Sequence, residues 1–168
     1  MKRLFGLVDA CVAGAVAVLF AVALILSLVG VAGRYVSARI ALDWVGEVVI
    51  YLVIWAVLLG AARVVRRAAH IRVDFLAERL APRAARLAEA LSLVLAFGLS
   101  LFLVWSGWKV VAEAIMWGER SVSTLRVPLW IYYAALPVSF ALQLLFLIER
   151  AFDLVTGRPA FSAIDLTD

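Results

Sequence analysis

Residues 10–33 read ACVAGAVAVLFAVALILSLVGVAG, a run of 24 residues without a charged side chain. A helix rises 1.5 Å per residue, so about 20 apolar residues are enough to cross the hydrocarbon core of a bilayer. Lys2 and Arg3 precede the run, as basic residues precede a signal sequence. The run is longer than the roughly 7–15 apolar residues of a signal peptide. We therefore expect a retained membrane-spanning helix.

Three further segments are apolar over a comparable length, namely 45–62, 87–117 and 127–148. The 168-residue chain is 67% hydrophobic and 17% charged, and a soluble domain of this size could not bury so much apolar surface. The sequence predicts an all-α integral membrane protein with four transmembrane helices in one membrane domain. Pro137 lies inside the last segment and should kink that helix. Gly118 is a plausible end for the helix before it.

The basic residues are distributed unevenly around these segments. With four spans, the two tails and the central loop share one side and carry 11 of the 16 Lys and Arg residues. The positive-inside rule therefore predicts that both termini are cytoplasmic, with residues 151–168 as a cytoplasmic tail. This topology explains the basic charge without nucleic-acid binding.

The central loop, residues 63–86, is basic, with apolar residues at helical spacing. This pattern predicts an amphipathic helix on the cytoplasmic membrane surface. Candidate contacts with the interface or with lipid headgroups are Arg66, Arg67, His70, Arg72 and Asp74. A solvated polar face with pairs four residues apart is the alternative for these side chains.

Polar and aromatic residues mark the end of the first span and the start of the second. Glu47, Tyr51 and Trp55 are spaced by four, so they share one face of a helix. The shallow position of Glu47 favours a polar contact between helices or subunits over a proton or cation site. Arg34 is either an interface anchor or the ion-pair partner of Asp43 or Glu47. The candidate subunit-contact or polar-interface residues are Arg34, Tyr35, Trp44, Glu47, Tyr51 and Trp55.

Nothing in the sequence indicates an enzyme, a metal site or a cofactor. His70 is the only histidine, and one histidine is too few for a zinc site. Catalysis by His70 with Asp74 would need a nucleophile and an oxyanion site nearby, and the sequence offers neither. The single cysteine, Cys11, is expected to be a small core residue. Gly30 and Gly33 could allow two helices to approach closely.

The order of several short motifs resembles the DctQ-type small membrane subunit of TRAP (tripartite ATP-independent periplasmic) transporters. The resemblance covers roughly residues 20–148. It rests on Arg34-Tyr35, Trp44 with Glu47, Leu52-Val53-Ile54-Trp55, Leu59-Gly60-Ala61-Ala62, His70-Ile71-Arg72-Val73-Asp74, Leu80-Ala81-Pro82-Arg83, Val127-Pro128-Leu129-Trp130 and Pro137. The family often has two adjacent acids after the tryptophan and a glycine before the histidine, whereas this chain has Gly46 before a lone Glu47, and Ala69.

The resemblance implies a four-helix scaffold subunit in the bacterial inner membrane. Its partners would be a large multi-span membrane subunit and a periplasmic binding protein that delivers the substrate, usually an organic acid anion. Import would be driven by a sodium gradient, with sodium and substrate bound in the large subunit and no cofactor in this chain. The small subunit would pack on the static part of the large subunit while an elevator domain moves.

Two alternatives are kept beside this interpretation. One is an independent four-helix transporter that works as a homodimer around Glu47. The other is the membrane anchor subunit of a redox complex, which would normally need histidines inside its spans. The scaffold is favoured physically, because a polar path across the bilayer needs buried polar groups. The first, third and fourth spans offer few: Ser27, Ser100, Ser106, Ser139 and Gln143.

Overall fold

The computed structural model describes residues 2–36, 43–67 and 82–155. This part of the chain forms five helices, which are α1 (Lys2–Val36), α2 (Val45–Arg67), α4 (Pro82–Met116), α5 (Trp130–Tyr133) and α6 (Ala135–Val155). Four helical segments are long and apolar enough to cross a membrane, namely Phe5–Tyr35, Val45–Val65, Ala90–Met116 and Trp130–Phe152. For the described residues, the prediction of an all-helical fold with four helices long and apolar enough to cross a membrane is confirmed.

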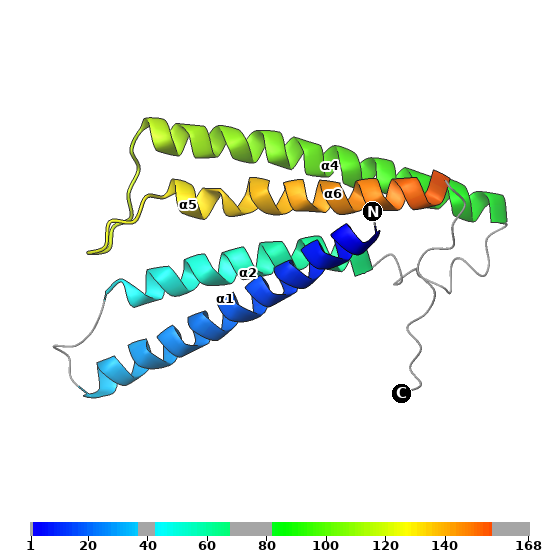
Figure 1. Cartoon of the computed structure of the whole chain (residues 1–168). Helices are drawn as coiled ribbons and strands as arrows, with labels where there is room; N and C mark the ends of the chain where they lie inside the picture. The colour runs from blue at the N-terminus through cyan, green and yellow to red at the C-terminus, as the bar shows by residue number, and fades with distance from the viewer. Residues whose placement is uncertain (1, 37–42, 68–81, 156–168) are drawn as a thin grey trace, which may run out of the picture.

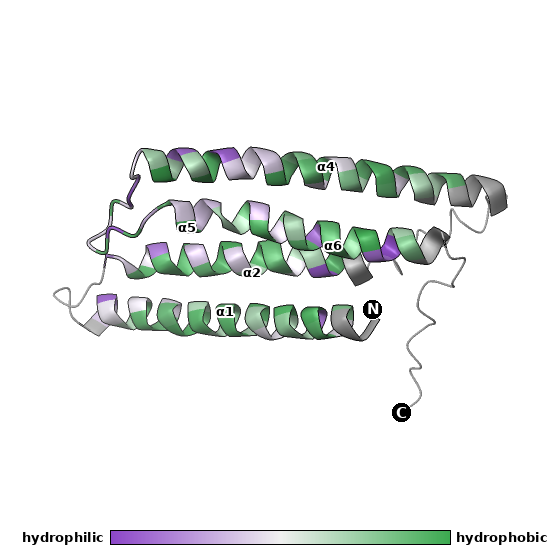
Figure 2. Ribbon diagram, turned by 45° about the horizontal axis from the view of Figure 1, so that its top comes forward, coloured by the Kyte–Doolittle hydropathy of each residue, from purple (hydrophilic) through white to green (hydrophobic). Residues whose placement is uncertain are grey.

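The long helices lie side by side in one row, in the spatial order α1, α2, α6, α4 (Figures 1 and 2). α1 packs on α2, α2 packs on α6, and α6 packs on α4. Among the described helices α4 comes next after α2 along the chain, but α6 separates the two in space. The described part of the chain is therefore an open layer and not a closed four-helix bundle.

Small residues set the distance between neighbouring helices. The buried apolar residues include Ala23, Ala56, Ala62, Ala114 and Ala135. A Cβ atom added to Gly107 of α4 would lie 2.8 Å from Leu136 Cδ2 and 2.9 Å from Pro137 Cδ. A Cβ atom on Gly30 of α1 would lie 2.9 Å from Val45 Cγ1. The expected close approach at Gly30 is confirmed, and Gly107 provides a second one between α4 and α6.

The edge helix α1 buries very little of its surface in this chain. Ala23 is its one buried residue among those whose side chains the structure describes. Cys11, expected in the core, is exposed on α1, and that prediction was wrong. The reason is that α1 has its main contacts with a single neighbour, so most of its apolar surface points outward.

The end of α4 is defined by its hydrogen bonds. The amide of Gly118 donates to the Ile115 oxygen at 3.1 Å, and the amide of Glu119 donates to the Ala114 oxygen at 3.0 Å. Gly118 has a φ of 60°, a left-handed conformation that costs glycine little. These features make a Schellman motif at the glycine that was predicted to end the helix.

The last membrane segment is interrupted at Ala134, between α5 and α6. Pro137 has no amide hydrogen, so the Tyr133 carbonyl cannot receive the bond that a continuous helix would supply. The interruption thus lies just before the proline at which a kink was predicted.

Hydrophilic residues gather mainly near the ends of the helices and in the connection between α4 and α5 (Figure 2). The start of α1 and the end of α6 lie at the same end of the layer (Figure 1). The helix α2 continues to Arg67, and α4 begins at Pro82. The interfacial helix was predicted for residues 63–86, of which 63–67 belong to α2, 82–86 belong to α4, and 68–81 lie outside the described residues. Most of the predicted tail, residues 156–168, also lies outside them.

Candidate functional site

The connection between α4 and α5 folds back on itself as a short hairpin, residues 118–129. The Leu129 amide donates to the Glu119 oxygen at 3.0 Å, and the Ser121 amide donates to the Val127 oxygen at 2.9 Å. A turn closes the hairpin, in which the Arg126 amide donates to the Ser123 oxygen at 3.0 Å. Arg126 takes a φ of 45°, a left-handed conformation that is uncommon for a residue with a side chain.

Asp43, just before α2, is bonded to the tip of this hairpin. The Thr124 hydroxyl donates to Asp43 Oδ1 at 2.8 Å, and the Thr124 amide donates to Asp43 Oδ2 at 3.1 Å. These two donors favour the charged carboxylate, so they lower the pKa of Asp43 below its ordinary value of 3.8.

Glu47 lies one turn further along, in the first turn of α2. Its carboxylate has Ser121, Ser123 and Tyr51 as polar neighbours. Ser121 Oγ accepts a bond from the Val127 amide at 3.1 Å and lies 3.2 Å from Ser123 Oγ. Glu47 Oε1 is buried and has no hydrogen-bond partner within the described part of the chain. The carboxylate therefore lies against the hydroxyl groups that hold the hairpin together.

Tyr51 and Trp55 continue the same face of α2 toward the middle of the membrane segment. The Tyr51 ring packs on the Tyr132 ring, with centroids 5.1 Å apart. Trp55 Nε1 donates to the Ile131 carbonyl oxygen at 3.1 Å, next to the interruption between α5 and α6. The polar face of α2 predicted from the spacing thus meets α5 and the hairpin of the same chain.

The other residues expected at this end are more open. Arg34 and Tyr35 are exposed at the end of α1, and among the described residues no ion pair joins Arg34 to Asp43 or Glu47. Asp43 instead bonds to Thr124. Trp44 is half-buried, and its carbonyl accepts the Val48 amide at 3.1 Å as α2 begins.

One ionic contact was missed by the sequence analysis. Arg63 of α2 binds Asp9 of α1 through two bonds, Nε to Oδ1 at 2.7 Å and Nη2 to Oδ2 at 3.1 Å. The side chains are only 18% and 17% exposed. The pair could have been predicted from the sequence, because two antiparallel spans bring the start of the first span and the end of the second to the same membrane face.

The candidates in the central loop are placed only in part. Arg66 and Arg67 lie in the last turn of α2, where the structure describes the backbone alone. His70, Arg72 and Asp74 lie outside the described residues. Within the part that is described, no group of three or more His, Cys, Asp or Glu side chains could hold a metal ion.

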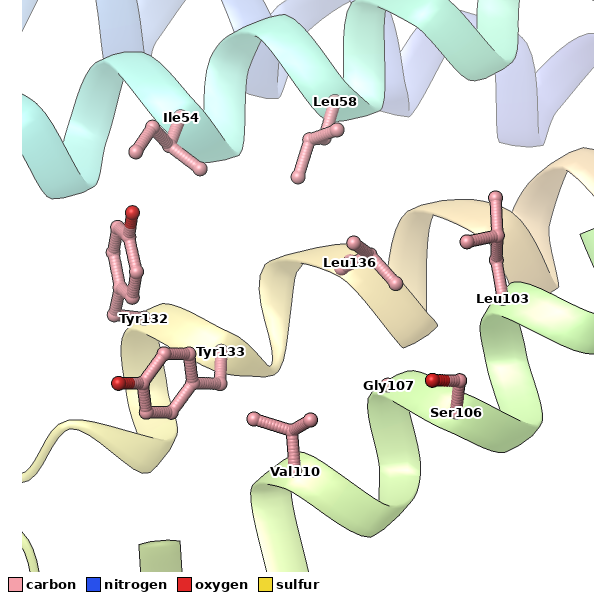
Figure 3. A pocket seen from close by; sticks show the side chains of 9 residues that line it. All are labelled: Ile54, Leu58, Leu103, Ser106, Gly107, Val110, Tyr132, Tyr133 and Leu136. Carbon is pink, nitrogen blue, oxygen red and sulfur yellow. The ribbon is translucent and has the colours of Figure 1, made fainter.

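An open pocket of about 220 Å³ lies where α2, α4, α5 and α6 meet. Figure 3 shows Ile54 and Leu58 of α2 facing Tyr132 and Leu136, with side chains of α4 on the opposite wall. The lining is apolar except for the hydroxyl groups of Ser106, Tyr132 and Tyr133. The pocket offers space next to the helix interruption but no cluster of charged groups.

Residues 23–157 match the family of tripartite ATP-independent periplasmic transporters, DctQ component. The chain belongs to the DctQ family. The matched residues include the whole of α2, α4, α5 and α6 and every residue around Asp43 and Glu47. This is a family of transporter components, so the chain is not assigned to an enzyme family, and its four apolar helices make it a multi-pass membrane protein.

The chain is also similar to the C4-dicarboxylate TRAP transporter small permease protein DctQ of Vibrio cholerae serotype O1 (strain ATCC 39315 / El Tor Inaba N16961). The two are 30% identical over an alignment of 140 residues, and the match covers 68% of this chain. The match spans 59% of the length of that relative.

Proposed function

We propose that this DctQ chain is the small membrane subunit of a TRAP transporter in the bacterial inner membrane. It packs on a large membrane subunit and acts as its scaffold, with both termini in the cytoplasm. The large subunit carries the transport pathway, and a periplasmic binding protein delivers an organic acid anion. Membership of the DctQ family and the similarity to a C4-dicarboxylate small permease protein support this assignment.

The open row of helices is the observation that carries the scaffold role. A pathway for an ion or an anion needs polar groups that face a shared interior. The buried polar residues of the described part are Ser100, Ser121 and Ser139. The Ser100 hydroxyl donates to the Ala96 carbonyl of its own helix at 2.7 Å, and Ser121 belongs to the hairpin. This part of the chain offers no polar route, so we place the route in a partner subunit.

The exposed apolar surface of the layer is consistent with such a partner. The share of each apolar span that is buried inside the chain is between 6% and 28%. In a membrane the rest of this surface meets either lipid or another protein, because lipid tails are as apolar as leucine side chains. A static scaffold subunit needs an apolar surface on which its partner can pack, and it does not need charged groups in its interior.

Co-purification tests the subunit assignment. We would purify the tagged chain from its native membrane in mild detergent and identify co-purifying proteins by mass spectrometry. We expect a large multi-span membrane protein in stoichiometric amount. A clean homo-oligomer that transports a substrate alone after reconstitution would overturn the proposal and favour the homodimeric transporter.

Reconstitution tests the energy source and the substrate class. Proteoliposomes would hold this chain with its large subunit, and C4-dicarboxylates would be supplied with the binding protein under a sodium gradient. We expect uptake that needs all three proteins and collapses when the sodium gradient is removed. Uptake that continues without this chain would show that the chain is not needed for transport. Uptake that does not depend on the sodium gradient would show that transport is not coupled to sodium.

A further inference from the structure

We propose that Asp43 and Glu47 form a carboxylate latch that holds the 118–129 hairpin against the start of α2. The latch consists of these two carboxylates with Ser121, Ser123 and Thr124 of the hairpin. Its effect is that the position of the hairpin depends on α2 and not only on the helices to which the hairpin is joined. The latch itself rests on contacts within this chain and is independent of the proposed function.

Polar groups of the hairpin converge on the two carboxylates at the start of α2. Asp43 receives both the amide and the hydroxyl of Thr124, and these bonds join residues 81 positions apart in the chain. Glu47 has Ser121, Ser123 and Tyr51 as polar neighbours, although its Oε1 receives no hydrogen bond within the described residues. Hydrogen bonds to a charged acceptor are stronger than bonds between neutral groups, so the two Thr124 bonds to Asp43 favour the docked hairpin.

Apolar burial does not fix the tip of the hairpin, although residues 127–129 at its base are half-buried. Val122 is fully exposed and Leu125 is 50% exposed, whereas Ser121 is buried. Burial of apolar surface is the usual force that fixes a loop on a protein. Because Val122 and Leu125 at the tip contribute little apolar burial, the polar contacts with α2 supply much of the docking free energy at this end of the hairpin.

The backbone of Arg126 shapes the tip of the hairpin. Its left-handed φ of 45° closes the turn that presents Thr124 to Asp43. This conformation costs free energy for a residue that has a side chain. The turn therefore carries some strain, and the bonds of Thr124 to Asp43 help to offset that cost in the docked hairpin.

Limited proteolysis of the full-length chain in lipid nanodiscs tests the latch. Arg120 and Arg126 are exposed in the hairpin and provide trypsin sites, and mass spectrometry distinguishes their fragments from all others. Cleavage reports the population of the open hairpin when opening and closing are fast. We expect the double variant Asp43→Ala/Glu47→Ala to be cut about tenfold faster than wild type at these two sites.

Milder substitutions separate the latch from a general loss of folding. Thr124→Val removes the hydroxyl donor at an exposed position and should give part of the acceleration, whereas Thr124→Ser should behave like wild type. Glu113→Gln on α4 removes an exposed carboxylate outside the latch and serves as the charge control. Hydrogen exchange of the Ser121 and Thr124 amides gives a second readout. Cleavage and exchange within about twofold of wild type in Asp43→Ala and Thr124→Val would overturn the proposal.

The consequence for transport rests on the proposed function and has its own measurement. In the reconstituted transporter, Thr124→Val and Asp43→Asn should assemble in wild-type amounts but support slower uptake, because the hairpin surface at the end of the layer is no longer held in place. Wild-type uptake together with faster hairpin cleavage would keep the latch and refute its role in transport. A chain without any large partner would refute the proposed function, and the proteolysis result would still decide the latch.

Discussion

The helices α1 and α6 differ most in how they sit in the layer. α1 lies at the edge and buries 6% of its apolar span inside the chain, whereas the span formed by α5 and α6 buries 28%. The more buried helix contains Ser139, Gln143 and Pro137, and α1 is the more apolar of the two. In a membrane, apolar character does not drive a helix into the protein, because lipid satisfies it equally well. Close packing and polar contacts decide the position instead.

The two helices are also held in different ways. α1 is attached to α2 by a close approach at Gly30 near one end and by the Asp9–Arg63 ion pair near the other. α6 is packed along its length between α2 and α4. Substitutions should therefore release α1 as a unit from the edge, whereas damage around α6 should affect the whole layer.

The largest expected effect follows from Arg63→Ala, which removes one partner of the ion pair that fixes α1. The Asp9 carboxylate would lose a two-bond guanidinium partner at a largely buried position, at a cost of about 3 kcal/mol. A spin label on Cys11, the single cysteine, should become more mobile while the contact between α4 and α6 persists. In a double-mutant cycle with Asp9→Asn, additive costs would show that the two side chains are not coupled.

Gly107→Ala should weaken the contact of α6 with α4. The added Cβ would lie 2.9 Å from Cδ of the rigid Pro137 ring, so the helices have to separate, at a cost of about 2 kcal/mol. Gly98→Ala on the same helix meets no atom within 4 Å and is the matched control. Equal free energies of unfolding for the two variants in mixed micelles would contradict the close approach.

Trp55→Phe should loosen the connection between α2 and α5 by a smaller amount. The Ile131 carbonyl oxygen would lose the indole donor beside the helix interruption, which costs about 1 kcal/mol. Infrared spectra of the chain with a ¹³C-labelled Ile131 carbonyl should show the loss of this bond. An unchanged carbonyl frequency would indicate that the tryptophan is not the donor.

The smallest effect concerns the charge of Asp43. The Thr124 donors lower its pKa, so the docked hairpin gains stability above the ordinary value of 3.8 and loses it as the pH falls through the lowered value. Hairpin docking should therefore be constant between about pH 5 and 8 and weaken only in stronger acid. An NMR titration of ¹³C-labelled aspartate should give Asp43 a pKa below 3.8 in wild type and a higher one in Thr124→Val. Identical titrations in both proteins would contradict the bonds to Thr124.

Several features of the site were predictable because they depend on local spacing. Positions four apart share a helix face, so Glu47, Tyr51 and Trp55 were expected to point the same way, and they do face the hairpin and α5. The partners of that face were not predictable, since residues of the hairpin and of α5 more than seventy positions later supply them. The choice of Thr124 over Arg34 as the partner of Asp43 depends on how the hairpin folds back, which charge alone does not indicate.

The sequence by itself determined that the chain forms membrane-spanning helices, roughly where they begin and end, and where glycine and proline interrupt them. These properties follow from the solvent preference and backbone geometry of each residue, so they are local. Only the tertiary structure decided that the helices form an open row, that α6 separates α2 from α4, and that α1 is the edge. The physical reason is that four apolar helices are nearly equivalent in lipid. Their order is chosen by a few small residues and polar contacts that act between distant parts of the chain.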